Sequence, residues 1–235
     1  MVQMILSDTA EPNAAVRLRF YKKGSLSFIA HLDLVRTVTK AIARAGIPVR
    51  YSEGFNPHPR LSFATAMSIG LESEYELLDI RLTKTVDVEL LRRAFNESLT
   101  PELQAVEAYI PTTKLNDIAY SSYRITIHTE GADSAMAERC ERALTLKPLV
   151  VFKRSKSGDK DTDISGGILR ISVIFDGEAL VIDTLLAADN AGFLNPEYLV
   201  GYLRDHLGVL CGPLDKEYYT LVRTGLYAKN GELFR

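Results

Sequence analysis

The sequence predicts an α+β protein built from two tandem ferredoxin-like units. Each unit is expected to have the order β-α-β-β-α-β, an antiparallel sheet, and helices on one face of that sheet. Two observations predict this class. Short segments that alternate between apolar and polar residues, as half-buried strands do, are interleaved with segments of helical periodicity. This series then repeats along the 235 residues. We therefore expect a flexible lead-in over residues 1–14, a first unit over 15–112 and a second unit over 121–235.

The first unit opens with a strand over residues 16–21, in which apolar and polar residues alternate cleanly. A helix over 28–45 follows, with Ser27 as its N-cap and Gly46 as the residue that ends it. The other expected elements of this unit are a short strand over 47–51, extended chain over 61–67, a strand over 75–82, a helix over 87–99 with Asp87 as N-cap, and a strand over 103–110.

The second unit repeats this plan. Residues 169–175 and 179–186 are expected to pair as a hairpin, because the dipeptide Asp176-Gly177 between them is a strong turn signal. The other expected elements are strands over 123–128, 149–154 and 218–227 and helices over 132–144 and 196–207, the last with Asn195 as its N-cap.

The composition is that of an ordinary globular chain, with 46% hydrophobic and 25% charged residues. Its two cysteines, Cys140 and Cys211, lie far apart and outside any C-x-x-C pattern. This argues against a disulfide scaffold, a zinc site or a cysteine-ligated cluster. The sequence also lacks the G-x-G-x-x-G, P-loop and H-E-x-x-H motifs. We therefore expect neither a cofactor nor a metal ion.

Targeting signals are missing as well. No apolar stretch approaches the roughly 18 residues that a membrane span requires. The first residues lack the basic start and long apolar run of a secretory signal. The sequence thus predicts a cytoplasmic protein without a membrane partner.

Three acidic residues, Asp159, Asp161 and Asp163, resemble the start of a calcium-binding loop. That motif needs Gly at its sixth position and Glu at its twelfth, and here Ile164 and Arg170 stand there. Because the motif fails and lysines surround the aspartates, we expect a solvated, mobile loop instead.

The stretch 52–63, which we call the proline loop, carries the most unusual local chemistry of the chain. Pro57 and Pro59 favour extended backbone for the residues before them and remove two backbone donors, and Gly54 permits a turn with positive φ. The loop should present an aromatic ring, an amide, an imidazole and a guanidinium. The candidate binding residues here are Ser52, Glu53, Phe55, Asn56, His58 and Arg60. The alternative is a rigid connector whose two phenylalanines pack into the core.

Charge is unevenly distributed in the first unit. Residues 1–66 carry nine Lys or Arg and four Asp or Glu, a balance of +5, whereas residues 67–111 carry four and nine. The first and third strands of a ferredoxin-like sheet are neighbours, so their charged residues should share the open face opposite the helices. These residues are Arg17, Arg19, Asp79 and Arg81. Clustered arginines suit phosphate contacts. The alternative is a salt-bridge network where the two units pack sheet to sheet.

Three residues are candidates for catalysis: His58, His31 and Asp79. An imidazole has an ordinary pKa of about 6.5, so His58 or His31 could serve as the general base of an RNA endonuclease. Asp79 among arginines could serve as the nucleophile of a pseudouridine-synthase-like enzyme. His31 and Asp33 do not form a pair, because they lie about 200° apart on a regular helix. The apolar side on which His31 falls favours a histidine at the edge of the core.

Several runs of the first unit are distinctive: Phe28-Ile29-Ala30-His31-Leu32-Asp33, Arg36, Ala43-Arg44-Ala45-Gly46, Tyr51-Ser52-Glu53-Gly54-Phe55-Asn56-Pro57-His58-Pro59 and Ser62-Phe63-Ala64. In these runs the chain resembles the radical-SAM-linked protein family, a bacterial family encoded beside, or fused to, a radical SAM protein. The resemblance covers residues 15–85 closely and the remainder loosely, and Ala30 stands where that family is expected to have Ser. It implies a radical SAM protein as partner, since this chain has no cluster-binding cysteines of its own.

The leading functional hypothesis is a noncatalytic accessory protein that works with a radical SAM enzyme and binds RNA or another phosphate-bearing substrate. The loop residues would supply specific contacts, and Arg17, Arg19 and Arg81 would supply phosphate contacts. Two alternatives stay open. One is an RNA-acting enzyme, either a metal-free endonuclease or a pseudouridine-synthase-like protein. The other is a protein–protein adaptor whose proline loop docks on the radical SAM partner.

Overall fold

The computed structural model describes residues 15–154, 158–189 and 192–235. It has four α-helices in this part of the chain and antiparallel sheets, so the predicted α+β class is confirmed. The described chain divides into two compact units, one up to Asp117 together with Arg235 and the other spanning Ile118–Phe234. The expected lead-in over residues 1–14 lies outside the described residues. Among the described helices, none is long and apolar enough to cross a membrane.

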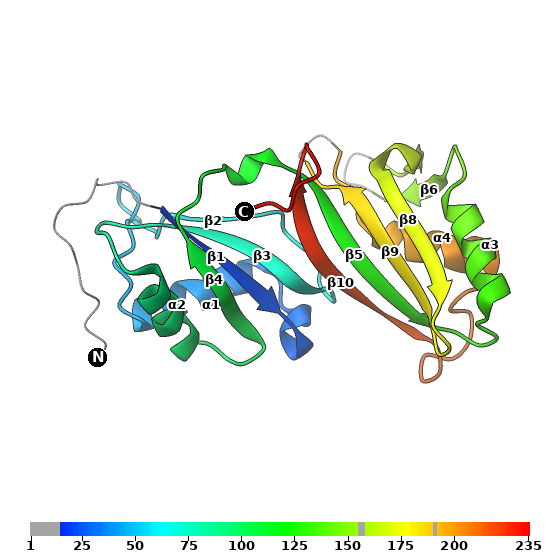
Figure 1. Ribbon diagram of the computed structural model, residues 1–235, viewed down its shortest axis with the longest axis horizontal. Helices are drawn as coiled ribbons and strands as arrows, with labels where there is room; N and C mark the ends of the chain where they lie inside the picture. Colours follow the sequence, from blue (N-terminus) through cyan, green and yellow to red (C-terminus); the bar gives the residue numbers. More distant parts are fainter. Residues whose placement is uncertain (1–14, 155–157, 190–191) are drawn as a thin grey trace. The chain divides into compact units, whose positions relative to one another are not determined.

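The first unit has one antiparallel sheet with the strand order β4-β1-β3-β2 (Figure 1). Its elements in chain order are β1 (Ala15–Lys22), α1 (His31–Arg44), β2 (Leu61–Phe63), β3 (Glu72–Arg81), α2 (Val88–Glu97) and β4 (Leu103–Tyr109). The predicted strand over 47–51 is reduced to two isolated bridges, Val49 with Leu82 and Tyr51 with Pro59. The two X-Pro steps that follow Tyr51 explain why pairing stops there.

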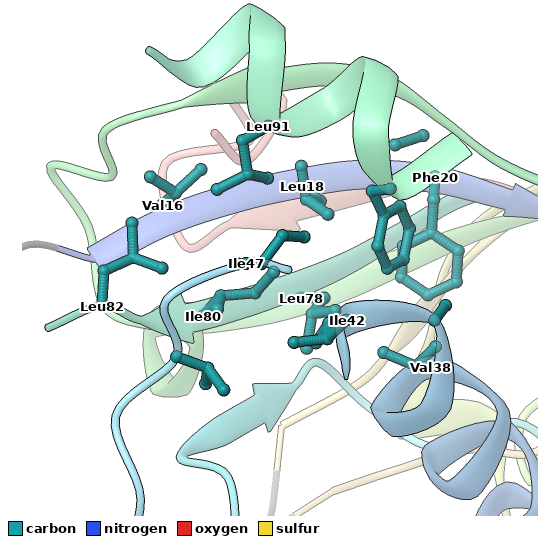
Figure 2. Close-up of a cluster of buried hydrophobic side chains, with 14 of the residues drawn as sticks. Val16, Leu18, Phe20, Val38, Ile42, Ile47, Leu78, Ile80, Leu82 and Leu91 are labelled. Carbon is teal, nitrogen blue, oxygen red and sulfur yellow. The ribbon is translucent and has the colours of Figure 1, made fainter. Parts of the chain in front are cut away.

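The core of this unit lies between one face of the sheet and both helices (Figure 2). The strand residues that alternate toward it are Val16, Leu18 and Phe20 on β1 and Leu78, Ile80 and Leu82 on or just after β3. Val38 and Ile42 from α1 and Leu91 from α2 pack against them. Because both helices share this face, the opposite face of the same strands carries the charged residues.

The ends of the helices are set by local chemistry. Asp87 caps α2 as predicted, with its Oδ1 accepting hydrogen bonds from the backbone N–H groups of Glu89 and Leu90, both at 2.9 Å. Gly46 follows α1 with φ +65°, as expected for a helix stop. The predicted N-cap Ser27 is wrong. Its hydroxyl donates to the carbonyl of Gly24 at 2.7 Å within a 3₁₀ turn, and α1 begins only at His31.

The second unit has a sheet with the order β10-β5-β9-β8, again antiparallel throughout (Figure 1). Its elements are β5 (Ile118–His128), α3 (Ser134–Leu144), β6 (Val150–Lys153), β7 (Lys160–Asp163), β8 (Ile168–Phe175), β9 (Leu180–Ala187), α4 (Glu197–Leu207) and β10 (Tyr218–Ala228). The turn at Asp176-Gly177 is confirmed, with Asp176 Oδ1 accepting from the N–H groups of Glu178 and Ala179 and Gly177 at φ +103°. Pro196 holds the N-cap position of α4, and the predicted cap Asn195 lies one residue earlier, where its Oδ1 accepts a hydrogen bond from the Glu197 N–H at 3.2 Å.

The segment with three aspartates departs from the prediction. Residues 160–163 form β7, which pairs with β6 in a separate two-stranded sheet, so Asp161 and Asp163 lie in a strand rather than in a mobile loop. Asp163 Oδ1 accepts hydrogen bonds from the N–H groups of Leu149, at 3.0 Å, and Ser165, at 2.9 Å. The carboxylate thus ties the start of one strand to the end of the other, which a motif search for metal ligands does not detect.

Candidate functional site

The proline loop is closed at its base by hydrogen bonds between Ser52 and His58. The Ser52 backbone N–H donates to the His58 carbonyl at 2.8 Å, and the His58 N–H donates to Ser52 Oγ at 3.1 Å. Ser52 Oγ also lies 2.9 Å from His58 Nδ1. Gly54 has φ +119°, a value open to glycine almost alone. Ser52, a predicted binding residue, therefore positions His58.

The residues at the tip of this loop point to solvent. Phe55 has a relative exposure of 106%, and Glu53 and Asn56 are exposed as well. The connector interpretation is therefore wrong for Phe55, which packs against nothing in the core. It holds for Phe63, whose ring packs against the core and makes edge-on contacts with Phe20 at 6.5 Å and His31 at 5.5 Å between centroids.

His31 and His58 line the same cavity, which has a volume of 460 Å³ and which we call the histidine pocket. Helix α1 contributes one row of its surface, because residues four apart lie one above the other. The lining residues are His31, Val35 and Thr39 from α1, His58 and Pro59 from the proline loop, and Leu61, Phe63 and Ala64 from β2 and its end. Two of the three catalytic candidates thus come together, although they are far apart in sequence.

A row of cations runs along α1 beside this pocket. Arg36, Lys40 and Arg44 recur every four residues and are exposed. Arg36 Nη1 donates to Asp33 Oδ1 at 2.9 Å, and Arg44 Nη2 donates to the Ser98 carbonyl at 2.6 Å. The spacing of Val35 and Thr39 from His31 was the signal that could have identified the pocket face.

The open face of the sheet holds a buried ion pair. Arg17 and Asp79 are register partners on β1 and β3, and the Arg17 guanidinium donates to both Asp79 oxygens, at 2.6 Å from Nε and 2.9 Å from Nη2. Thr113 accepts two more hydrogen bonds from Arg17, through its hydroxyl and its carbonyl, both at 2.9 Å. Burial alone would lower the pKa of Arg17, but the hydrogen bonds and charge of Asp79 offset it and raise that pKa. The expectation that Arg17 lies exposed is wrong, since its side chain has 0% exposure.

Arg19 is also engaged within the first unit. Its Nη2 lies 3.0 Å from Glu107 Oε1, and its guanidinium carbon lies 5.1 Å from the centroid of the Tyr75 ring. The hydrogen bond from Arg19 lowers the pKa of Glu107 below its ordinary value. Arg17 and Arg19 thus both form ion pairs within the first unit, and a salt-bridge network between the two units stays a prediction. Arg81 is exposed.

A second cavity, of 570 Å³, lies on the Asp79 side of the sheet, and we call it the Asp79 cavity. Its lining comprises Ala15, Ser62, Asp79, Arg81 and residues 110–116. The alternation of β2 separates the two cavities, because Ser62 faces this one whereas Leu61 and Phe63 face the histidine pocket. Within the residues that the structure describes, no three His, Cys, Asp or Glu side chains gather so as to hold a metal ion.

The sequence matches, over residues 15–196, the model of a family described as an uncharacterized protein conserved in bacteria (DUF2344). The chain belongs to this family. The expectation of a bacterial protein family is thereby confirmed for this DUF2344 chain, and the link to a radical SAM protein stays a prediction. No curated protein matches the sequence.

Three solved structures were found to be similar to the DUF2344 chain. The first is a chain of a Cbf5-Nop10-Gar1 complex, with a TM-score of 0.49, 8% identity and 96% coverage of this chain; the match covers 56% of that chain. An unknown protein from Galdieria sulphuraria has a TM-score of 0.27 and 12% identity, with 90% and 98% of the two chains covered. DyPB from Rhodococcus jostii RHA1 has a TM-score of 0.18 and 13% identity, with 92% and 94% covered. All three TM-scores are below 0.5, so no functional residue is transferred from these structures.

Proposed function

We propose that the protein is a noncatalytic accessory protein that binds single-stranded RNA for a radical SAM enzyme. The proline loop and the histidine pocket would hold one nucleotide, and the cations around them would contact phosphates. The observation that carries this proposal is the fully exposed Phe55, on a closed loop whose His58 lines a pocket with His31.

We also propose that both units are ferredoxin-like. Counted without the β6–β7 hairpin, each unit has four strands, with helices after the first and the third. The orders β4-β1-β3-β2 and β10-β5-β9-β8 then both read 4-1-3-2. Such agreement supports an internal duplication of one β-α-β-β-α-β plan, with the hairpin inserted into the second copy.

The aromatic ring supports a nucleic-acid ligand. Leaving a Phe side chain in water forgoes about 1.5–3 kcal/mol of burial free energy, which favours a role for Phe55 in binding. Single-stranded RNA is bound largely by stacking of splayed bases on aromatic and histidine rings. The histidine pocket combines imidazole hydrogen-bonding groups with the apolar walls of Leu61 and Phe63, the mixture that a base requires.

The charges nearby suit the backbone of the same ligand. Arg60 is exposed at the end of the proline loop, and Lys40 is exposed on the α1 row beside the pocket. Phosphate contacts position RNA without reading its sequence, and each contact to a single strand contributes a slope of about -0.7 in log K against log salt concentration. Arg17 and Arg19 are left out of this set because both are held in ion pairs.

The test is binding of the purified full chain to fluorescent single-stranded RNA across a salt series. We expect salt-dependent binding that weakens in His58→Ala/Arg60→Ala, with the salt slope smaller in magnitude by about 0.7 for the lost Arg60 contact. Arg139→Ala, an exposed arginine on α3 of the second unit, is the matched control and should bind as the wild type does. Wild-type RNA binding that is unchanged by the double substitution would contradict the proposal.

The radical SAM partner rests on the resemblance in the first unit. A tagged full chain, expressed together with the radical SAM protein encoded beside it, is expected to copurify with that protein and with RNA. Copurification of the partner without RNA, combined with no RNA binding at low salt, would favour the adaptor alternative.

A second candidate function is an RNA-acting enzyme, and two observations favour it. His31 and His58 line one pocket, so one imidazole could take a proton while the other supplies one. Asp79 lines the other cavity with its carboxylate held by Arg17, as a nucleophile would need to be oriented. RNA turnover by the isolated chain that is lost in His58→Ala, His31→Ala or Asp79→Asn would favour an RNA-acting enzyme over a noncatalytic accessory protein.

A further inference from the structure

The histidine pocket has two ends that differ in chemistry. His31 and Thr39 line it from the same row of α1 and are eight residues apart, which is about 12 Å along the helix axis. Val35 lies between them in this row. A cavity of this length, with a volume of 460 Å³, is long enough for a base together with its ribose.

The direction of β2 decides which residues gather at each end of the pocket. Strands β1 and β2 both run antiparallel to β3, so they are parallel to each other, and the connecting helix α1 runs back in the opposite direction. The end of β2 therefore lies beside the start of α1, in agreement with the contact between Phe63 and His31, whose ring centroids are 5.5 Å apart. Leu61 and the residues before it, among them His58, lie toward the Thr39 end.

The charges around the pocket give a nucleotide one orientation. The lining has no carboxylate, ammonium or guanidinium group, so it suits the uncharged parts of a nucleotide. The two cations that the proposed function assigns to phosphate are chain neighbours of the Thr39 end, because Lys40 follows Thr39 and Arg60 precedes Leu61. A nucleotide whose phosphate lies at these cations has its ribose beside Thr39 and its base at the opposite end.

The hydroxyl of Thr39 is available to a ligand. It has no hydrogen-bond partner among the described residues, although a threonine in a helix often bonds to the carbonyl four residues earlier. Thr145, the C-cap of α3, makes that usual contact, with its Oγ1 donating to the Glu141 carbonyl at 3.0 Å. A threonine hydroxyl both donates and accepts, as does the ribose 2′-hydroxyl, the group by which a protein distinguishes RNA from DNA.

We propose that Thr39 makes the histidine pocket selective for a ribonucleotide, because its hydroxyl bonds to the 2′-hydroxyl of the bound sugar. The base packs at the end formed by His31 and Phe63, and the phosphate lies at Lys40 and Arg60. This inference rests on the proposed function, since it assigns the sugar in the same site. A deoxynucleotide in that position leaves the Thr39 hydroxyl without this contact.

The test is binding of the full chain to a fluorescent single-stranded RNA and to a DNA of the same sequence, with deoxyuridine for uridine. We expect the wild type to bind the RNA at least about threefold more tightly, the effect of one neutral hydrogen bond. Thr39→Val, which has nearly the same shape but no hydroxyl, should lose this preference through weaker RNA binding, with its DNA affinity unchanged. Thr39→Ser, which keeps the hydroxyl, should keep the preference. Thr37→Val, at a threonine of α1 outside the pocket lining, is the matched control and should bind as the wild type does.

A series of RNAs with one 2′-deoxynucleotide each then locates the contact. One position should weaken wild-type binding by about threefold or more and have no effect on Thr39→Val. Binding that is lost in His58→Ala/Arg60→Ala but is equally tight for RNA and DNA would overturn the inference and leave the proposed site in place. So would an RNA preference that persists in folded Thr39→Val. No nucleic-acid binding by the folded wild type would overturn both the inference and the proposed function.

Discussion

Asp79 accepts two parallel hydrogen bonds from the side chain of Arg17, whose guanidinium is fully buried although it lies on the polar side of β1. The hydroxyl and carbonyl oxygens of Thr113 accept two further hydrogen bonds from the same guanidinium. Because these groups hold one another, the pair contributes to the stability of the first unit as well as to the floor of the Asp79 cavity.

The ion pair gives a prediction for stability. Removing one member of a buried pair leaves the other charge without its partner and costs about 3–5 kcal/mol. Asp79→Ala should therefore lower the free energy of unfolding by about that amount, measured by urea denaturation. Asp79→Asn, which keeps one acceptor oxygen, should lose less. A change below about 0.5 kcal/mol in Asp79→Ala, no larger than that of the control Arg139→Ala, would mean that the pair contributes little.

Phe55 gives the opposite pattern, a loss of binding without a loss of stability. Its ring is fully exposed, so Phe55→Ala should leave the unfolding midpoint unchanged. Removing a stacking ring is expected to cost about 1–3 kcal/mol in RNA binding, and Phe55→Trp should retain most of the affinity. Leu214→Ala, at a residue of the second unit that is 91% exposed, is the matched control. If wild type and Phe55→Ala bind RNA with the same affinity, the Phe55 ring does not contribute to RNA binding.

The hydrogen bonds at the base of the proline loop give a third prediction. Ser52→Ala removes the hydroxyl that meets both Nδ1 and the backbone N–H of His58, so His58 becomes less ordered. We expect a several-fold weaker RNA affinity and a small change in stability, since the loop is exposed. His58→Asn, which can still bond to Ser52, should bind RNA better than His58→Ala. The exposed Ser134→Ala on α3 serves as control, and equal affinities of His58→Asn and His58→Ala would argue against this positioning role.

Acid stability of the second unit should depend on Glu217. Its Oε1 accepts from the Glu130 N–H at 2.7 Å and the Thr129 hydroxyl at 2.8 Å, and its Oε2 accepts from the Gly212 N–H. These bonds, foremost that from Glu130, lower the pKa of Glu217 below its ordinary value of 4.5. A lowered folded pKa means that the charged form stabilises the fold above pH 4.5. That contribution is lost as the pH falls from 4.5 through the folded pKa.

The measurement is urea unfolding of wild type and Glu217→Gln at pH 7 and at a series of pH values below 4.5. The difference in stability between the two proteins should be largest at pH 7 and shrink as the pH falls. Asp215→Asn, an exposed carboxylate nearby in sequence, is the control. A difference that is independent of pH would show that Glu217 acts through packing rather than through its charge.

The sequence was sufficient for most elements and their order, because alternation and helical periodicity are local properties. It did not predict β7, and it placed a strand at 47–51 where the structure has only two isolated bridges. It placed Arg17 and Asp79 on one face, since strand pairing makes them neighbours. It did not predict that Arg17 is buried, because Thr113, which takes two of its hydrogen bonds, stands 96 residues further along the chain. Alternation along a strand predicts that a polar side chain is exposed, and a hydrogen-bond partner far away in the sequence is not visible in that pattern.

The candidate site was predicted in part for the same reason. The proline loop was located by its Pro and Gly residues, which act on their own backbone. The meeting of His31 and His58 in one pocket depends on how α1 packs against β2, which no local pattern encodes. Serine favours the N-cap position, but the hydroxyl of Ser27 is used in the preceding 3₁₀ turn.

Strand β2 is only three residues long, yet it lines both the histidine pocket and the Asp79 cavity. Its side chains point alternately to one cavity and to the other, so the pairing register of β2 decides which cavity each side chain lines. A slip of β2 by one residue against β3 would turn Leu61 and Phe63 toward the Asp79 cavity and Ser62 toward the histidine pocket. The lining of the histidine pocket and that of the Asp79 cavity would then change together. The pairing register of these three residues therefore determines the lining of both cavities at once.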